Sequence, residues 1–220
     1  MKADQPTLPK ILVLASGSGT NLQALIESSR ERDFPGQIVA VGCNRPKAFA
    51  LERAAQANVE TFMVNHEDFS SREEFDAALM AHILRHNPDL IVLAGFMRIL
   101  TTDFVRAFRG RLINIHPSLL PRHTGLNTHQ RALDAGDRIH GVSVHFVTEE
   151  LDGGPVIAQA EVAVVPEDTA ETLAEKVQAK EHLLYPIVVR WFCEGRIQLG
   201  GEHIMFDGQA LNTPMRLPDN

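Results

Sequence analysis

Leu112-Ile113-Asn114-Ile115-His116-Pro117-Ser118-Leu119-Leu120-Pro121 is the stretch of this sequence that decides how the rest is interpreted. Its first half has the apolar character of a short strand, and because strand side chains alternate between faces, Asn114 and His116 point the same way. Pro117 cannot donate to a sheet ladder, so the chain leaves the sheet there as an extended loop. Ligands of parallel α/β sheets bind beyond the carboxyl ends of the strands. An amide and an imidazole in that place can polarise a carbonyl group and move a proton, although a buried histidine without a catalytic role is the commoner case.

The chain around this strand alternates between patterns typical of strands and of helices. Strands are expected at 11–15, 38–41, 61–64, 90–94, 112–116, 140–148 and 156–164, and helices at 22–26, 48–57, 70–86, 102–108, 128–136 and 169–185, where Pro186 bends or interrupts the last one. The wholly apolar run at 90–94 is typical of a central parallel strand buried on both faces. Repeated strand-helix units predict an α/β fold: a single Rossmann-like domain over residues 1–220, doubly wound, with a mostly parallel sheet of about seven strands and helices on both faces.

Local signals predict where several elements begin and end. Ser70 with Glu73 is a capping-box pattern at the start of one helix, and Asp168 with Glu171 is an N-cap pattern at the start of another. A small hairpin is expected from 197–199 and 204–206. Residues 1–9 are interpreted as an N-terminal extension, and 211–220, with two prolines, as a flexible tail.

The composition is that of an ordinary globular protein, with 44% apolar and 22% charged residues among 220. The net charge of −7 disfavours nucleic acid and anionic membranes as partners. The two cysteines, Cys43 and Cys193, form no Cys-x-x-Cys pair, which fits a reducing compartment. No apolar run approaches the ~18 residues of a membrane span, and the first residues lack a signal-peptide core. We therefore expect a cytoplasmic protein.

A glycine-rich turn, Ser16-Gly17-Ser18-Gly19-Thr20-Asn21, follows the first strand and precedes a helix. In such a turn the unpaired amide N–H groups of the helix start can hold an anion. The turn lacks the Lys-Ser/Thr ending of a P-loop, and Leu22 replaces the third glycine of a dinucleotide fingerprint, so ATP and NAD are disfavoured. A phosphate site is favoured over a simple turn capped by Thr20 or Asn21.

Three loops combine a functional with an ordinary structural interpretation. Residues 95–100, Gly-Phe-Met-Arg-Ile-Leu, could line the site of a flat aromatic ligand or form an apolar cover over the next helix. The sequence favours neither interpretation. Residues 122–127 have no periodicity, which predicts a mobile loop near the site. Asp152 precedes two glycines, and an Asp in such a turn often only hydrogen-bonds its own backbone.

Two pairs of polar residues are interpreted as solvent-facing from the local pattern alone. Ser143 and His145 share one face of the strand at 140–148, opposite to apolar residues. Gln178 and Glu181 are three apart on a helix and so lie on one face, which is usually a solvated face.

In combination these segments resemble the glycinamide ribonucleotide formyltransferase family. The matching segments are 15–23, 93–100, 114–121, 143–147 with 151–155, and Val177-Gln178 with Glu181-His182. They occur in the right order from about residue 11 to 191. The resemblance implies the formyltransferase fold and transfer of a formyl group from 10-formyltetrahydrofolate, as co-substrate, to the amine of 5-phosphoribosylglycinamide, without a metal. It leaves open a monomer or a homodimer.

The resemblance also implies roles for individual residues. Asn114, His116 and Asp152 would be catalytic: Asn114 and a protonated His116 would stabilise the oxyanion formed by amine attack, and Asp152 would favour the charged imidazole and help relay the proton. The ribonucleotide would contact Gly19, Thr20, Asn21, Gln178 and Glu181. The folate would contact Arg72, Met97, Arg98, Ile99, Leu100, Asn114, Thr148, Glu149, Glu150 and Leu151.

Two positions depart from the pattern expected of bacterial relatives. Asn127 stands where His is frequent, which puts in doubt proton handling by that loop position. Val142 stands where Thr is frequent, a change that we interpret as packing.

Several alternatives share part of the pattern. A methionyl-tRNA formyltransferase would carry a further RNA-binding domain, and a formyltetrahydrofolate deformylase a regulatory domain ahead of the first strand, for which the segment before residue 11 leaves no room. A metal hydrolase would use His116, His123, His129 and His145, whose spacing matches no common zinc pattern. A non-enzymatic nucleotide-sensing Rossmann-like domain would bind phosphate without folate-dependent turnover.

Overall fold

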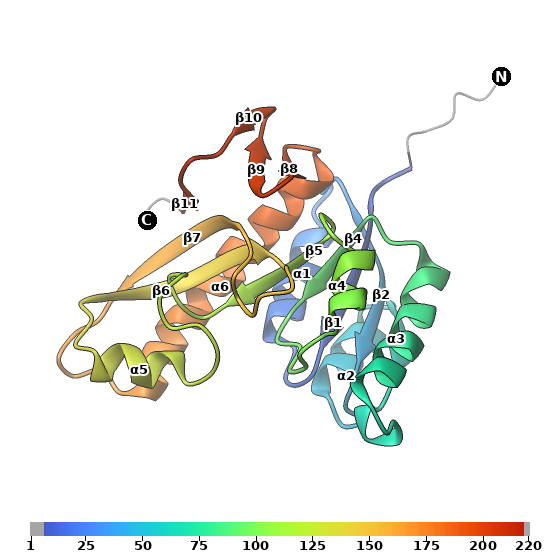
Figure 1. Ribbon diagram of the computed structural model, residues 1–220, viewed down its shortest axis with the longest axis horizontal. Coiled ribbons are helices and arrows are strands. Elements are labelled where there is room, and N and C mark those ends of the chain that lie inside the picture. Colours follow the sequence, from blue (N-terminus) through green and yellow to red (C-terminus); the bar gives the residue numbers. More distant parts are fainter. Residues whose placement is uncertain (1–6, 218–220) are drawn as a thin grey trace.

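The computed structural model describes residues 7–217 (Figure 1). The strands are β1 (Lys10–Ala15), β2 (Gln37–Cys43), β3 (Glu60–Met63), β4 (Leu90–Leu93), β5 (Leu112–His116), β6 (Ile139–Phe146), β7 (Val156–Ala163), β8 (Ile197–Gly200), β9 (His203–Phe206), β10 (Gln209–Ala210) and β11 (Met215–Arg216). The helices are α1 (Thr20–Ser29), α2 (Phe49–Gln56), α3 (Arg72–His86), α4 (Thr102–Ala107), α5 (Thr128–Asp134) and α6 (Ala170–Cys193), with a 3-10 turn at His66–Asp68.

Within the described residues the central sheet has eight strands in the order β11-β7-β6-β5-β4-β1-β2-β3. All neighbouring pairs are parallel except β5 with β6 and β6 with β7. This confirms the doubly wound, mostly parallel α/β fold. The strand order reverses between β1 and β4, and the carboxyl ends of strands at such a reversal form the crevice where open α/β sheets bind ligands.

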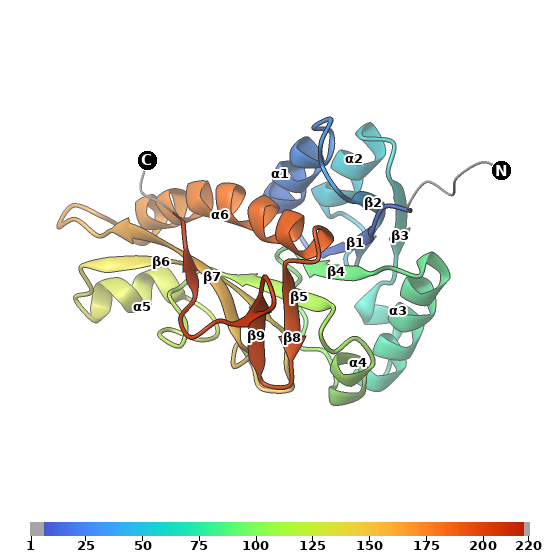
Figure 2. The same ribbon diagram turned by 90° about the horizontal axis from the view of Figure 1, so that it is seen from above.

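Helices cover both faces of the sheet, with α1, α2 and α6 on one face and α3 and α4 on the other (Figure 2). Strand side chains alternate between the two cores: Ile11 and Val13 of β1 join the core under α1 and α6, whereas Leu12 and Leu14 join the core under α3 and α4. Because β1 and β4 are buried on both sides, they contain only apolar residues beyond Lys10.

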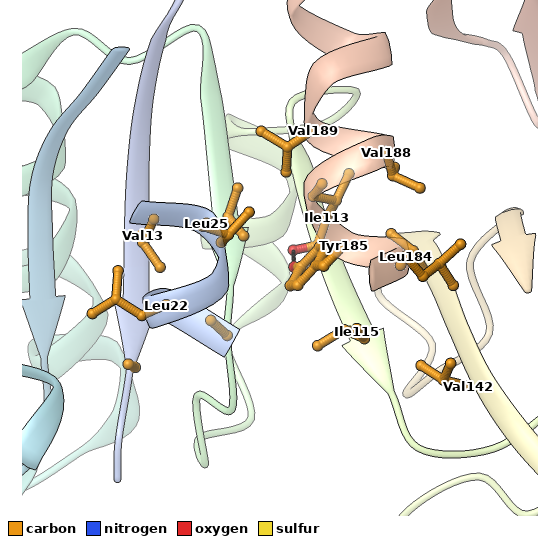
Figure 3. Packing of buried hydrophobic residues seen from close by; sticks show 14 of the residues in the cluster. Val13, Leu22, Leu25, Ile113, Ile115, Val142, Leu184, Tyr185, Val188 and Val189 are labelled. Carbon is orange, nitrogen blue, oxygen red and sulfur yellow. Dashed lines mark hydrogen bonds between the residues drawn. The ribbon is translucent and has the colours of Figure 1, made fainter. Parts of the chain in front are cut away.

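The long helix α6 fills the first of these cores. Leu184, Tyr185, Val188 and Val189 point from α6 toward β5 and β6 (Figure 3). The Tyr185 hydroxyl donates to the backbone carbonyl of Leu93, 2.9 Å away. Of the two expectations for Pro186, that it bends or interrupts this helix, the interruption was wrong. Proline removes one backbone hydrogen bond, but the buried residues on either side hold α6 continuous to Cys193.

Three helix starts differ from the predicted caps. Gly19, in the left-handed conformation, is the N-cap of α1, so neither Thr20 nor Asn21 caps it. Ser71, not Ser70, caps α3 and accepts from the N–H of Glu74. Thr169 caps α6 in a capping box with Thr172, whereas the Asp168 carboxylate accepts from the N–H of Val165. In the last two, the neighbouring residue offers the backbone conformation that its side chain needs to reach the third helical N–H.

The carboxyl-terminal part is more ordered than expected. The predicted hairpin is confirmed as β8 and β9, and β10 extends it to three strands. The prediction of a flexible tail was wrong for residues 211–217, because β11 pairs with β7 and Leu217 N–H donates to the carbonyl of Gln159. Residues 218–220, and residues 1–6 of the predicted extension, lie outside the described part. None of the helices in residues 7–217 combines the length and apolar character needed to cross a membrane.

Candidate active site

The glycine-rich turn after β1 and the segment after β4 are joined at the carboxyl edge of the sheet. Ser16 N–H donates to the carbonyl of Gly95, and Met97 N–H donates to the Ser16 hydroxyl at 2.7 Å. That hydroxyl in turn donates to Asn44 Oδ1 at the end of β2, 2.6 Å away. One buried serine therefore connects the two segments that the sequence assigned to phosphate and to folate.

Asp152 lies beside His116, at the end of β5. Their side chains are 8% and 7% exposed, and Asp152 Oδ2 is 3.5 Å from Nδ1 of His116. The carboxylate accepts a 2.8 Å hydrogen bond from the N–H of Gly125. The interpretation of Asp152 as a turn residue that bonds only its own backbone was therefore wrong. Its positive φ of 53° turns the side chain toward β5 and the 122–127 loop, which does lie next to the site.

The tautomer of His116 follows from its second contact. Nε2 lies 2.9 Å from the backbone carbonyl of His123. A carbonyl only accepts, so Nε2 carries a proton, and Nδ1 is the ring atom that faces Asp152. The carboxylate therefore lies where it can stabilise a second proton on the ring.

Asn114 faces His145 across the β5–β6 pair. His145 Nδ1 lies 2.9 Å from the carbonyl of Phe146, so it donates there and leaves Nε2 as an acceptor. Asn114 Nδ2, 3.2 Å away, donates to Nε2, which fixes the amide orientation and leaves its second N–H for a ligand. Burial lowers the pKa of His145 and so keeps the ring neutral, as this arrangement requires.

The sequence analysis considered His145 only as a metal ligand and missed its contact with Asn114, and the prediction that Ser143 and His145 face solvent was wrong. Both are buried. The Ser143 hydroxyl donates to the carbonyl of Ser118 and accepts from the N–H of Leu120. The loop after β5 thus folds back over this face of β6. The only available signal was the match of the 143–147 segment to the formyltransferase family, since strand alternation cannot reveal a covering loop.

The start of α1 meets the middle of α6 on the other side of the crevice. Asn21 Nδ2 donates to Glu181 at 2.7 Å, and Gln178 Nε2 donates to the Thr20 hydroxyl at 3.3 Å. Gln178 and Glu181 therefore do not form a purely solvated face. Burial raises the pKa of Glu181. Asn21 Oδ1 is buried without a hydrogen-bond partner among the described residues, which suits it to a ligand donor.

The residues assigned to folate lie in the segment after β4 and in elements around it. Met97 and Ile99 are 62% and 57% exposed, as is Leu151 at 57%, so they form an apolar rim. The Arg98 guanidinium lies over the ring of Phe75 on α3, with Leu100 partly buried below. Arg72 is the exposed first residue of α3.

The turn assigned to folate is less uniform. The Glu149 carboxylate pairs with Arg106 of α4 at 3.0 Å rather than facing the rim, while Thr148 is partly buried and Glu150 is exposed. Main-chain groups of this turn and the apolar rim are thus its main means of contacting a ligand.

Several of the histidines considered for a metal lie together behind His116. Asp137 accepts from Nε2 of His123 at 2.7 Å, and Nδ1 of His129 lies 3.2 Å from Nε2 of His140. This hydrogen bond from His123 lowers the pKa of Asp137. In residues 7–217 no group of three or more His, Cys, Asp or Glu side chains has a geometry that could hold a metal ion.

Comparisons with known proteins show the family of this chain. A family described as formyl transferase matches residues 9–189. Phosphoribosylglycinamide formyltransferase of Escherichia coli (strain K12) is 49% identical over 201 residues, which are 91% of this chain and 95% of the relative. The enzyme of the same name from Haemophilus influenzae is 45% identical over 204 residues, 93% of this chain and 96% of the relative.

Solved structures of such enzymes also resemble this chain in fold and sequence. Phosphoribosylglycinamide formyltransferase from Coxiella burnetii superposes with a TM-score of 0.91 at 48% identity, covering 96% of this chain and all of the other. Glycinamide ribonucleotide transformylase 1 from Symbiobacterium toebii gives 0.88 at 42% identity, covering 92% and 95%.

Proposed function

The chain belongs to the formyl transferase family and is an enzyme of purine biosynthesis that formylates 5-phosphoribosylglycinamide, and from this premise we propose that the formyl donor is 10-formyltetrahydrofolate and that Asn114, His116 and Asp152 carry the reaction. This assignment is supported by the short distance between the buried side chains of Asp152 and His116, next to Asn114. We also propose that residues 1–220 act as one domain in the cytoplasm, as a monomer or homodimer, on small molecules rather than nucleic acid or membranes.

Asn114 and His116 stabilise the charge that develops on the formyl oxygen. The substrate amine forms a bond to the formyl carbon, and the carbonyl electron pair moves to the oxygen. Asn114 has one N–H free after its bond to His145 and can donate it to that oxygen, whereas His116 Nε2 is engaged by the carbonyl of His123, so His116 contributes the positive charge of its protonated ring. Such fixed donors contribute most where charge develops in the transition state.

Asp152 acts through His116. Its carboxylate favours the doubly protonated ring, and a proton at Nδ1 can pass between ring and carboxylate as the amine loses its own proton. When the oxyanion collapses, the bond between the formyl carbon and the folate nitrogen breaks, and that nitrogen gains a proton and leaves as tetrahydrofolate. No bond from an enzyme side chain to the formyl group is needed. The chemistry is general acid–base and electrostatic.

The two substrates would enter from opposite sides of this trio. Gly19, Thr20 and Asn21 would hold the phosphate and ribose end of the ribonucleotide, with Gln178 and Glu181 contacting it from α6. The folate would lie on the apolar rim of Met97, Ile99 and Leu151, near Arg72, Arg98 and Leu100, with the turn from Thr148 to Glu150 at its edge. The absence of an acidic residue from the first turn of α1 favours an anion there.

A direct test is the absorbance of the folate product when the purified protein is mixed with both substrates, each omitted in turn. We expect turnover only with both present. Asn114→Ala and His116→Ala should each lower turnover by roughly a hundredfold or more, as loss of an oxyanion donor or acid–base group does, while ribonucleotide binding survives. Near-normal turnover in both variants would contradict the assignment.

A deformylase would use the same trio to transfer the formyl group to water. It would release formate from the folate at the same rate with and without the ribonucleotide. A formate assay in both conditions separates the two reactions, and we expect no formate in either condition, with the formylated product formed only when the amine acceptor is present.

A further inference from the structure

Helix α2 contacts the glycine-rich turn through two hydrogen bonds that fix its backbone. Ala50 N–H donates to the carbonyl of Gly17 at 3.1 Å, and Arg53 Nε donates to the carbonyl of Ser18 at 2.8 Å. The contact is close: a Cβ on Gly19 would lie 2.8 Å from both Cα and Cβ of Ala50. The carbonyl groups of Gly17 and Ser18 therefore face α2.

The Arg53 guanidinium is held by two further contacts. Its Nη1 donates to Gln23 Oε1 on α1 at 3.2 Å, and its Cζ lies 4.8 Å from the centre of the Phe49 ring. The planar guanidinium can make these contacts at once, which an ammonium group cannot. Arg53 thus joins α2, the turn and α1, and among the described residues no carboxylate lies within salt-bridge distance of it.

The contacts of α2 with the Gly17 and Ser18 carbonyls also orient the next amide N–H groups of the turn. In a trans peptide unit the C=O and N–H bonds point in opposite directions. Because the Ser18 carbonyl points at Arg53, the N–H of Gly19 points away from α2, and the Ala50 contact turns the N–H of Ser18 the same way. The first turn of α1 has no side-chain cap, so these N–H groups and the helix start are left to an external anion.

We propose that Arg53 is a positioning residue for the phosphate of the ribonucleotide, aiming the Gly19 N–H by holding the Ser18 carbonyl. This inference rests on the proposed binding of the ribonucleotide at residues 19–21. The new element is that a residue of α2, outside the turn itself, orients the amide donors. The guanidinium also supplies a positive charge beside a turn that contains none.

The test compares Arg53→Gln and Arg53→Lys with the wild-type enzyme. We expect Arg53→Gln to raise both the KM for the ribonucleotide and the inhibition constant of inorganic phosphate roughly tenfold, the scale of one hydrogen bond to a charged group. The KM for folate and kcat at saturation should stay within about twofold, since neither depends on the phosphate contact. Arg53→Lys, which keeps the charge but not the fork, should recover only part of the loss.

Arg85→Gln is the matched control, because it removes an exposed arginine of α3 that also bonds a backbone carbonyl, that of Ala81. It should leave both constants unchanged. A folded Arg53→Gln protein with wild-type constants would overturn the proposal, and if that variant does not fold, wild-type constants in Arg53→Lys would do so.

Titration of inorganic phosphate by calorimetry separates this inference from the assigned reaction. If the wild type fails to formylate the ribonucleotide, the proposed function fails. Phosphate binding that still weakens about tenfold in Arg53→Gln supports the positioning role on its own, and phosphate binding that is absent, or equal in both proteins, contradicts it.

Discussion

The Asp152 carboxylate lies 3.5 Å from Nδ1 of His116, with both side chains almost fully buried. The distance is too long for a strong hydrogen bond, so the coupling between them in this state is mainly electrostatic. Asp152 is held in place by the N–H of Gly125, and His116 by the carbonyl of His123, both in the loop that follows β5. The geometry of the pair therefore depends on the conformation of that loop.

Asp152→Asn should separate charge from shape at this position. The amide oxygen can still accept from Gly125, but the partner that favours a charged His116 is lost. We expect kcat to fall by roughly a hundredfold or more, the scale of an acid–base group, with little change in either KM. Steady-state kinetics with both substrates measures it, and a variant within threefold of wild-type kcat would show that Asp152 has no part in proton transfer.

Gly19→Val should mainly weaken ribonucleotide binding. Gly19 has φ of 69°, and a Cβ would meet Ala50, so the turn must shift and the amide donors with it. We expect the ribonucleotide KM to rise roughly tenfold or more, with a smaller effect on the folate KM. Gly201→Val is the control, because Gly201 has φ of 68° but open space around its Cβ position, far from the site in the β8–β9 hairpin. Equal effects of the two variants would mean that backbone strain alone is responsible.

His145→Leu tests the orientation of Asn114. Leu cannot accept from Asn114 Nδ2, so the amide is free to turn its oxygen toward the reacting carbonyl, where it would repel the oxyanion. We expect kcat to fall at least about tenfold, as for loss of part of an oxyanion hole, and His145→Gln, whose amide oxygen can accept, to recover some of it. Unchanged kcat in the folded Leu variant would contradict a positioning role.

The central fold could be predicted because its signals are local. The apolar run of β4, the turn after β1 and the alternation in β5 are all written in contiguous residues, and they placed Asn114 and His116 on one face of a strand. The family resemblance then supplied Asp152, whose local pattern alone indicated a turn residue bonded to its own backbone, and Gln178 and Glu181, whose local pattern alone indicated a solvated face.

What the sequence concealed depends on contacts between distant segments. His145 and Ser143 are buried because residues 117–122 fold over β6, and residues 211–217 are ordered because Met215 pairs with Ala158. Strand periodicity records which residues share a face, but not what covers that face. The clamp of Arg53 on Ser18 is hidden for the same reason, since a helical arginine normally faces water.

Glu181→Gln should stabilise the fold while weakening ribonucleotide binding. Burial raises the pKa of Glu181, so the folded state disfavours the carboxylate and loses stability as the pH rises through that raised pKa. Gln is neutral at every pH, and its oxygen can still accept from Asn21. We expect the melting temperature of the variant to match the wild type at acid pH and to exceed it at pH 8. Gln178→Glu is an informative comparison because it adds a charge on the same face and should lower the melting temperature. A Glu181→Gln protein less stable than wild type at pH 8 would show that the carboxylate is well paired.

His140 should set part of the acid limit of stability. Burial lowers the pKa of this side chain to about 4, and its Nε2 lies 3.2 Å from Nδ1 of His129, so the folded state keeps the ring neutral. The unfolded chain takes up the proton near pH 6.5, so the stabilisation is complete above that pH and is lost as the pH falls toward 4. At about 1.4 kcal/mol per pH unit, this predicts a loss of roughly 2 kcal/mol between pH 6.5 and 5. Urea denaturation of His140→Gln at the two pH values should show a loss smaller by about that amount, whereas His203→Gln, which alters an exposed histidine of β9, should behave as the wild type. If the wild type and His140→Gln lost the same unfolding free energy between the two pH values, the loss would come from groups other than His140.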